Sequence, residues 1–294
     1  MEIKKISDKN IVTRIGDVRI YIKKEEVNTF LRFENQGQLL DASEIITVPV
    51  LSNDIDYKSM GILVILSSLY NTKTKKVNDK YIFEYLININ NLVSEFKRFR
   101  SNVKNETVAN GVNKLINKLK QCDEFVNLEE YDKHLRLTLA SKQYFSINEN
   151  LIMSCLKSDK SSSKKISILG ILGQICKYSI YEKNSEIFYG KAICLAKQKD
   201  LYSYSSISKT QWNKLFNEMV EDGLLCFVKT YSPVYGTLKY YIADAYSFDY
   251  LVWYLSYGKV AITSNIYIRE YYLNGVHFID EKEDYDYDDV QEVA

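Results

Sequence analysis

The chain has 294 residues, of which 46% are hydrophobic and 26% charged, an ordinary composition for a globular protein with one or two cores. No uninterrupted apolar stretch approaches the ~18 residues of a membrane span, and Met1–Lys5 is not followed by the apolar segment of a signal peptide. We therefore expect a cytoplasmic protein that makes no contact with a membrane.

The net charge of +1 hides an uneven distribution of charge along the chain. Residues 279–294 contain eight acidic residues and one lysine, about −7, which leaves about +8 on residues 1–278. The acidic segment is predicted to be a disordered tail, and the basic body is typical of nucleic-acid-binding proteins. The five cysteines have no CxxC spacing, which favours buried free thiols in a reducing compartment.

Residues 1–44 are predicted to form an extension that contains a β-hairpin. Ile11–Ile15 and Val18–Ile22 are strand-like and flank Gly16 and Asp17, a two-residue turn with glycine first. Because an isolated hairpin is only marginally stable, we expect it to pack on its own domain or on a second subunit.

Residues 45–141 are the first of two predicted domains. An extended segment is followed by four helices and two strands, predicted at Ile45–Leu51, Tyr57–Tyr70, Asp79–Ile87, Leu92–Ser101, Glu106–Lys120, Phe125–Leu128 and Leu135–Leu139. The helix at Glu106–Lys120 has Asn105 or Thr107 as its N-cap and a single apolar face, formed by Val108, Val112, Leu115, Ile116 and Leu119.

Residues 142–245 are the second predicted domain, with the same series of elements. An extended segment, three helices and two strands are predicted at Tyr144–Ile147, Lys165–Tyr178, Ser185–Lys199, Lys209–Glu221, Leu224–Tyr231 and Leu238–Ala243. Ser206 or Ser208 caps the third helix, and Gly223 supplies its C-terminal stop. Residues 246–278 are predicted to be an extension with helices around Phe248–Leu255 and Ile266–Leu273.

Two short sequence matches indicate that the second domain is a copy of the first. Asn113–Asn117 reads NKLIN and recurs as NKLFN at Asn213–Asn217, an offset of 100 residues (113 to 213). Ile62–Leu66 reads ILVIL and recurs as ILGIL at Ile168–Leu172, an offset of 106 residues (62 to 168). A difference in one loop length would absorb the gap between the two offsets. We call residues 45–141 the first copy and residues 142–245 the second copy.

Three helices followed by a two-stranded hairpin is the element order of winged-helix domains. The resemblance is clearest at Ser206–Val228, where a capped helix is followed by Glu221-Asp222-Gly223-Leu224 and a strand. In the first copy Asp123 replaces the glycine. The predicted fold class is thus α+β, mainly helical, with two tandem winged-helix domains, an N-terminal β-hairpin and a disordered acidic tail.

In winged-helix proteins the third helix enters the major groove and the hairpin contacts the flanking backbone. The candidate DNA-binding residues of the second copy are Lys209, Thr210, Gln211, Asn213, Lys214 and Asn217 on the helix, with Tyr235 and Lys239 on the hairpin. Those of the first copy are Asn110, Asn113, Lys114, Asn117 and Lys118, with a basic patch of Lys97, Arg98, Arg100 and Lys104 and a weaker pair, Lys133 and His134. The alternative is that these residues form solvated polar faces.

The tandem arrangement resembles plasmid and phage replication initiator proteins at the level of architecture. That resemblance implies sequence-specific binding of double-stranded DNA, with the second copy reading origin repeats. It also implies that the first copy forms a homodimer, or contacts adjacent DNA and host replication proteins. A transcriptional regulator or partition protein, or an interaction scaffold without DNA, are the alternatives.

The sequence contains none of the motifs that would indicate an enzyme. Its two histidines are far apart, no phosphate-binding loop of the GxxxxGK[ST] type occurs, and no zinc-ligand spacing is present. We therefore expect no catalytic residues, no metal and no cofactor.

Overall fold

The computed structural model describes residues 3–5, 10–15, 18–23, 45–99, 105–131, 133–183, 190–232, 237–257, 267–273 and 276–279. The chain is α+β, and all strand pairs of the described residues are antiparallel. Among these residues strands contribute about as many positions as helices, so this part of the chain is less helical than expected. No helix of these ranges is long and apolar enough to cross a membrane.

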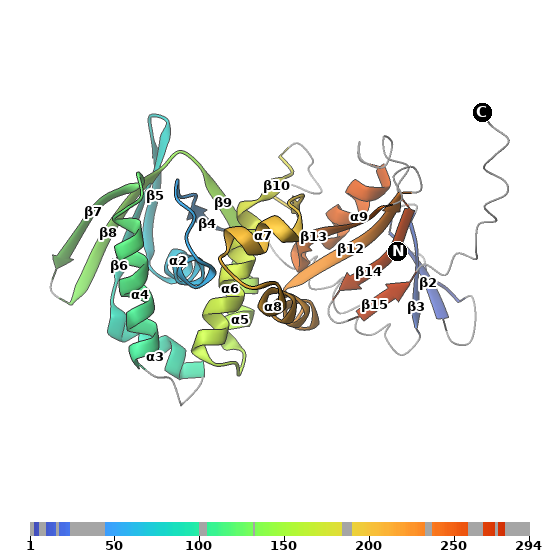
Figure 1. Cartoon of the computed structure of the whole chain (residues 1–294), viewed down its shortest axis with the longest axis horizontal. Helices are drawn as coiled ribbons and strands as arrows, with labels where there is room; N and C mark the ends of the chain where they lie inside the picture. The colour runs from blue at the N-terminus through green and yellow to red at the C-terminus, as the bar shows by residue number, and fades with distance from the viewer. Residues whose placement is uncertain are drawn as a thin grey trace.

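The first copy consists of helices packed on one face of a four-stranded sheet (Figure 1). Its elements, in chain order, are β4 Ile45–Pro49, α2 Tyr57–Leu69, β5 Asn71–Val77, β6 Lys80–Ile87, α3 Ile89–Phe99, α4 Asn105–Leu119, β7 Phe125–Tyr131 and β8 His134–Ser141. The strand order in this sheet is β5-β6-β8-β7. The second strand of the first hairpin therefore pairs with the second strand of the last hairpin.

The second copy repeats this arrangement. Its elements are β9 Tyr144–Asn148, α5 Glu149–Lys157, α6 Ser162–Lys177, β10 Ser179–Tyr181, β11 Ala192–Cys194, α7 Gln198–Tyr204, α8 Lys209–Glu221, β12 Leu225–Ser232 and β13 Thr237–Asp244. The strand order β10-β11-β13-β12 matches that of the first copy strand for strand. The internal repeat is therefore visible in the topology as well as in the sequence.

The remaining elements extend the second sheet and add one helix. They are η2 Ala245–Ser247, α9 Phe248–Tyr257, β14 Tyr267–Leu273 and β15 Val276–Ile279. The expected N-terminal hairpin is present as β2 Asn10–Ile15 and β3 Val18–Lys23, joined by β1 Ile3–Lys5 in a three-stranded sheet. Strand β3 lies next to β15. The predicted acidic tail lies outside the described residues, apart from Ile279.

Three predicted helices are wrong. Asp79–Ile87 is mostly strand β6, because Phe83, Tyr85 and Ile87 are buried at alternate positions, the period of a strand. Ser185–Lys199 contains β11 and only the start of α7. The described part of Ile266–Leu273 is strand β14, whose isoleucine and tyrosines favour extended backbone. Helix α5, which the sequence reading did not predict, follows β9 directly.

Helices α2 and α6 join the two copies through a close crossing at two glycines. A Cβ atom added at Gly61 would overlap the carbonyl oxygen of Ile166, and one added at Gly170 would overlap that of Tyr57. This reciprocity makes Gly61 and Gly170 equivalent, 109 residues apart (61 to 170). The ILVIL and ILGIL match, at an offset of 106, is therefore not the structural alignment of these helices.

A single continuous cluster of buried apolar side chains runs through both copies, from Val48 to Ala245. Strand β4 of the first copy pairs with β9 of the second, which adds backbone hydrogen bonds to this shared core. In Figure 1 the four-stranded sheet of the first copy lies on the left and the six-stranded sheet that contains β12 and β13 lies on the right. Helices α2, α5, α6 and α8 lie between these two sheets. The two copies thus share one core and are held in a fixed arrangement.

Candidate nucleic-acid interface

The third helices of the two copies, α4 and α8, are equivalent in their packing. Each apolar face is buried, and the buried residues recur at the offset of 100, as Val112 and Trp212, Leu115 and Leu215, Ile116 and Phe216, and Leu119 and Met219. Burial of this stripe leaves the opposite face of each helix to the solvent. The NKLIN and NKLFN match is therefore a structural equivalence as well.

The predicted side chains on the outward face of α8 are all exposed. These are Lys209, Thr210, Gln211, Asn213, Lys214 and Asn217. Ser208 caps the helix, since its hydroxyl accepts a hydrogen bond of 3.2 Å from the backbone N–H of Gln211. Gly223 has a φ of 71°, the left-handed conformation expected after the helix end. The first turn of α8 contains Lys209 and no acidic residue, so its field is positive.

The outward face of α4 is also polar, but its two lysines interact with another part of the chain. Asn110, Asn113, Lys114 and Asn117 are exposed, whereas Lys118 is only partly exposed. The Lys118 ammonium forms a short ion pair with the carboxylate of Asp56, the N-cap of α2. Lys114 lies 3.7 Å from the same carboxylate. Both lysines predicted to contact DNA from α4 therefore have an internal partner.

The carboxylate of Asp56 is held in its charged form by several hydrogen bonds. Burial alone would raise its pKa, but hydrogen bonds from Lys118 and Ser59 stabilise the charged form and lower the pKa to about 2. Asp56 also caps α2, because its Oδ1 accepts hydrogen bonds from the backbone N–H groups of Lys58 and Ser59. One carboxylate thus fixes both the start of α2 and the lysines of α4.

The second copy has the corresponding ion pair with the charges reversed. Glu218 of α8 occupies the position equivalent to Lys118, 100 residues on. Its partners are Lys164 at 2.6 Å and Lys160 at 3.1 Å, at the start of α6 and just before it. Lys160 also pairs with Asp222 at 3.1 Å. Hydrogen bonds from Lys164 and Lys160 lower the pKa of Glu218 against the effect of burial. The residue of α8 that pairs with the α6 region is therefore the acidic Glu218. Lys209 and Lys214 form no ion pair with another described residue.

The segment Ser52–Tyr57, which we call the bridging segment, contacts both third helices. On the first copy, Asp56 pairs with Lys118 and the Asn53 side chain donates to the carbonyl of Gln121 at 2.8 Å. On the second copy, the hydroxyl of Tyr57 accepts a hydrogen bond of 2.9 Å from Nε2 of Gln211. This segment therefore contacts residues in or next to both third helices.

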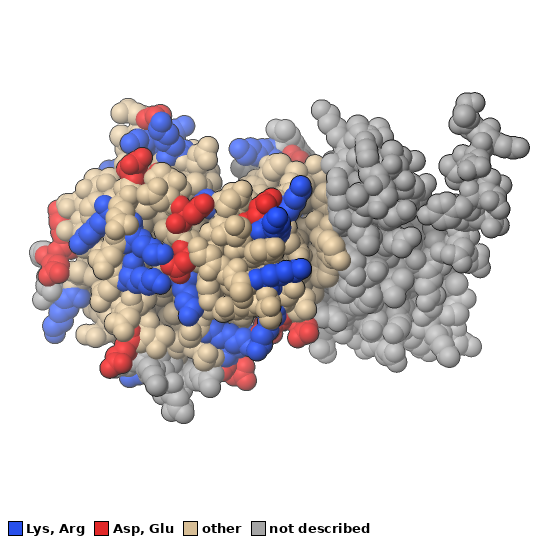
Figure 2. Space-filling view, in the orientation of Figure 1, with Lys and Arg blue, Asp and Glu red and all other residues tan. Residues whose placement is uncertain are grey.

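Further contacts of the bridging segment reach helices α6 and α7. Asp54 pairs with Lys177 at 3.0 Å, and the backbone N–H of Tyr57 donates to the carbonyl of Ser205 at 3.1 Å. In Figure 1, α4 and α8 lie on either side of α2 and α6. Figure 2, in the same orientation, shows basic side chains over α4 and over the region of α7 and α8. One face of the molecule thus presents both third helices.

The hairpin of the first copy forms a polar cleft with α4 and the start of α3. The cleft has a volume of about 330 Å³, and its polar lining is Asn88, Asn90, Asn113, Glu130, Lys133 and His134. Nδ2 of Asn88 lies 3.5 Å from Nε2 of His134. The structure therefore brings Asn113 together with the weaker candidates Lys133 and His134. Because Glu130 lines the cleft and Glu129 is also exposed on this hairpin, the site is poorly suited to a phosphate.

The other predicted residues are only partly placed. Lys97 is exposed on α3, and Arg98 belongs to the same helix. Arg100, Lys104 and Tyr235 lie outside the described residues, as does the side chain of Lys239 in β13. Sequence reasoning missed Asp56 and Tyr57. The only local signal was an aspartate before a helix, which indicates an N-cap but not a partner on another helix.

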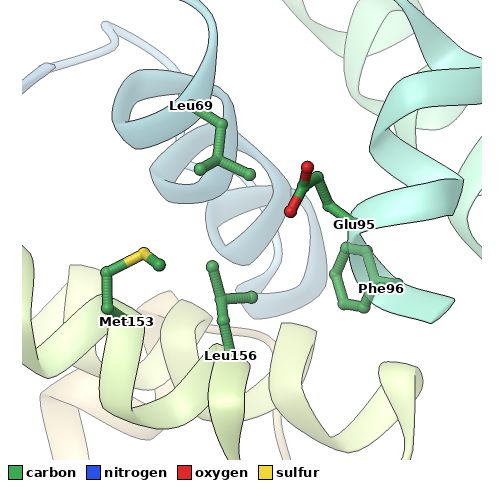
Figure 3. A pocket seen from close by; sticks show the side chains of 5 residues that line it. All are labelled: Leu69, Glu95, Phe96, Met153 and Leu156. Atoms are coloured by element: carbon green, nitrogen blue, oxygen red, sulfur yellow. The ribbon is translucent and has the colours of Figure 1, made fainter. Parts of the chain in front are cut away.

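A second, much smaller cavity lies between α2, α3 and α5 (Figure 3). Its volume is about 10 Å³, and it is lined by Leu69, Glu95, Phe96, Met153 and Leu156. This space is too small for more than one water molecule, so it is a packing defect and not a ligand site.

The remaining reactive groups of the described residues are buried. All five cysteines are free and buried, as expected. Burial raises the pKa of Cys155 to about 12 and that of Cys194 to about 11, which keeps these thiols protonated and unreactive. Within the described ranges no three His, Cys, Asp or Glu residues form a cluster that could hold a metal ion.

Comparison with known proteins adds no family to this description. No protein-family model matches the chain, and no curated protein or solved structure does so significantly. The function must therefore be argued from the residues themselves.

Proposed function

We propose that the chain binds double-stranded DNA sequence-specifically through two tandem winged-helix domains, residues 45–141 and 142–245. The observation that carries the proposal is the pair of equivalent third helices, which expose polar and basic faces on one side of a shared core. Each is followed by a two-stranded hairpin, β7–β8 or β12–β13, which supports the proposal because a hairpin after the third helix is what a wing requires. This combination suits a helix placed in the major groove with its hairpin beside the backbone.

The second copy is the better candidate for base recognition. Lysine side chains neutralise phosphates or contact guanine, and the amides of Gln211, Asn213 and Asn217 can form bidentate hydrogen bonds with adenine. Lys209 and Lys214 are exposed and form no ion pair with another described residue. In the first copy the equivalent helix directs Lys114 and Lys118 toward Asp56, and its hairpin carries two exposed glutamates.

The biological role that we favour is that of a plasmid or phage replication initiator, a non-enzymatic cytoplasmic protein. What supports this role is the difference between the outward lysines of α8, which form no ion pair with another described residue, and those of α4, which pair with Asp56. It suits one copy that reads repeated sites and another that forms a homodimer or contacts host replication proteins. A transcriptional regulator or partition protein would use the same DNA-binding surface, and the proposal for DNA binding does not depend on that choice.

The experiment that tests DNA binding is fluorescence anisotropy of a random-sequence 30-base-pair duplex between about 50 and 200 mM salt. Because lysine–phosphate contacts release counterions, the logarithm of affinity should fall linearly with the logarithm of salt, by about 0.9 per contact. A full-length protein that does not bind at 50 mM salt, or whose binding is independent of salt, would contradict the proposal and favour an interaction scaffold.

A further inference from the structure

One exposed side chain of α8 is held by a residue of the other copy. Nε2 of Gln211 donates a 2.9 Å hydrogen bond to the hydroxyl of Tyr57, at the start of α2. The other predicted side chains on this face of α8 form no hydrogen bond with another described residue. From this contact we propose that Tyr57 is a positioning residue for Gln211, so that the first copy helps to set the base preference of the second. The inference rests on the proposed function.

Tyr57 is itself immobilised from several sides. Its side chain belongs to the buried core, and its residue is only 8% exposed. Its backbone N–H donates to Ser205, and its carbonyl lies so close to Gly170 that no side chain could be accommodated there. The hydroxyl is therefore presented at a fixed point beside the first turn of α8.

The chemistry of a primary amide explains why this contact would aid base recognition. The Gln211 amide has two N–H donors on Nε2 and one carbonyl acceptor. When Tyr57 binds the N–H that points away from the carbonyl, the other N–H and the carbonyl remain together on one edge, and this is the edge that pairs with N7 and N6 of adenine. The hydroxyl thus restrains rotation of the amide without occupying its recognition edge. Since Ser208 already binds the backbone N–H of Gln211, the residue is held at both ends.

The test is selection from a pool of duplexes with 20 randomised base pairs, carried out with the full chain and three variants. Tyr57→Phe removes the hydroxyl and keeps the ring, and Gln211→Ala removes the amide. Tyr178→Phe is the matched control, because its hydroxyl contacts Asp54 of the same bridging segment at 3.4 Å and no residue of α8. Affinity for random duplex is measured in parallel.

We expect Gln211→Ala to lose the preference at one position of the selected motif. Tyr57→Phe should weaken the preference at that same position by about fivefold or more. The control Tyr178→Phe should select the full motif and bind random duplex within about twofold of the unchanged chain. In the double variant the loss should equal that of Gln211→Ala alone, because the two residues act through one contact.

Other outcomes would overturn the inference. If Gln211→Ala relaxes a position that Tyr57→Phe leaves intact, Tyr57 does not position the amide. If Tyr57→Phe weakens all positions equally, its role is structural. If the unchanged chain selects no motif, the proposed function fails and this inference fails with it, which is a distinguishable result.

A measurement on the unchanged chain covers the case in which Tyr57→Phe does not fold. The side-chain ¹⁵N–¹H signals of Gln211 are assigned by their loss in Gln211→Ala. One of its two amide protons should exchange with water more slowly than those of Asn213, which lies on the same face. Equal exchange rates would show that Tyr57 does not restrain Gln211.

Discussion

The two copies share a topology but use their third helices differently. In the first copy the charged side chain of α4 that pairs within the protein is Lys118, whose partner is Asp56 at the start of α2. In the second copy it is Glu218, paired with Lys160 and Lys164 around the start of α6. Lys114 and Lys118 of α4 thus interact with Asp56, whereas Lys209 and Lys214 of α8 form no ion pair with another described residue. The two copies therefore differ in the ion pairing of their third helices.

The largest effect that we predict concerns the crossing that holds the copies together. Gly170→Ala would place a methyl group against the carbonyl oxygen of Tyr57, a backbone atom that cannot move aside. We expect a loss of about 3 kcal/mol or more in the free energy of unfolding, measured in urea.

The matched control for this crossing is Gly111→Ala in α4. Its added methyl group would meet only the end of the Ile62 side chain, at 3.1 Å, and alanine favours helix more than glycine does. We expect a change within about 1 kcal/mol. If Gly170→Ala lowers the free energy of unfolding no more than Gly111→Ala does, close packing at this crossing does not hold the two copies together.

The next effect contrasts one carboxyl group of each copy, Asp244 and Asp56. Burial raises the pKa of Asp244 to about 6, although Ser247 donates hydrogen bonds to it. Because the folded chain binds this proton more tightly than the unfolded chain, the stabilisation is complete below about pH 3.8 and is lost as the pH rises through about 6. Asp244→Asn keeps an acceptor for Ser247 and should remove about 3 kcal/mol of this pH dependence between pH 4 and 7.

Asp56 should show the opposite sign. Its pKa is lowered, so its stabilisation is present above about pH 3.8 and is lost as the pH falls toward about 2. The free energy of unfolding of the unchanged chain should therefore fall at acid pH, and Asp56→Asn should lack this part of the fall. Urea unfolding at a series of pH values measures the difference. Parallel pH profiles for the two variants would contradict the opposite environments that we describe.

A smaller effect distinguishes the lysines of the two third helices. Replacing Lys209 and Lys214 with alanine should reduce the salt dependence of duplex binding by about 0.9 per lost phosphate contact, close to 2 in total. Replacing Lys114 and Lys118 should change that slope by less than 1, because both lysines are engaged with Asp56. Equal changes in slope would mean that both helices contact phosphates to the same extent.

Local signals predicted the third helix of each copy and the hairpin that follows it. Helix α8 begins and ends where the sequence placed it, since Ser208 and Gly223 are local signals for its two ends. Strand β6 was misread as a helix although one of its partners, β5, directly precedes it in a hairpin; its other partner is β8. Its alternating apolar residues were the available signal.

The bridging segment shows what sequence reasoning could not supply. Tyr57 and Gln211 are 154 residues apart, and no pattern of residue types indicates that they meet. The outward faces of both third helices followed from their apolar periodicity. Whether a lysine on such a face is free or paired depends on a residue elsewhere in the chain, as Lys118 and Asp56 demonstrate.

The central claim, that the second copy reads bases, is tested most directly by comparing Asn213→Ala with Asn113→Ala. Both asparagines are exposed and occupy equivalent positions. For each variant, affinity is measured for a duplex selected by the unchanged chain and for a random duplex. We predict that Asn213→Ala loses about 1–3 kcal/mol of discrimination, and that Asn113→Ala leaves the ratio of the two affinities unchanged. Loss of discrimination in Asn113→Ala alone would reverse the assignment of the two copies.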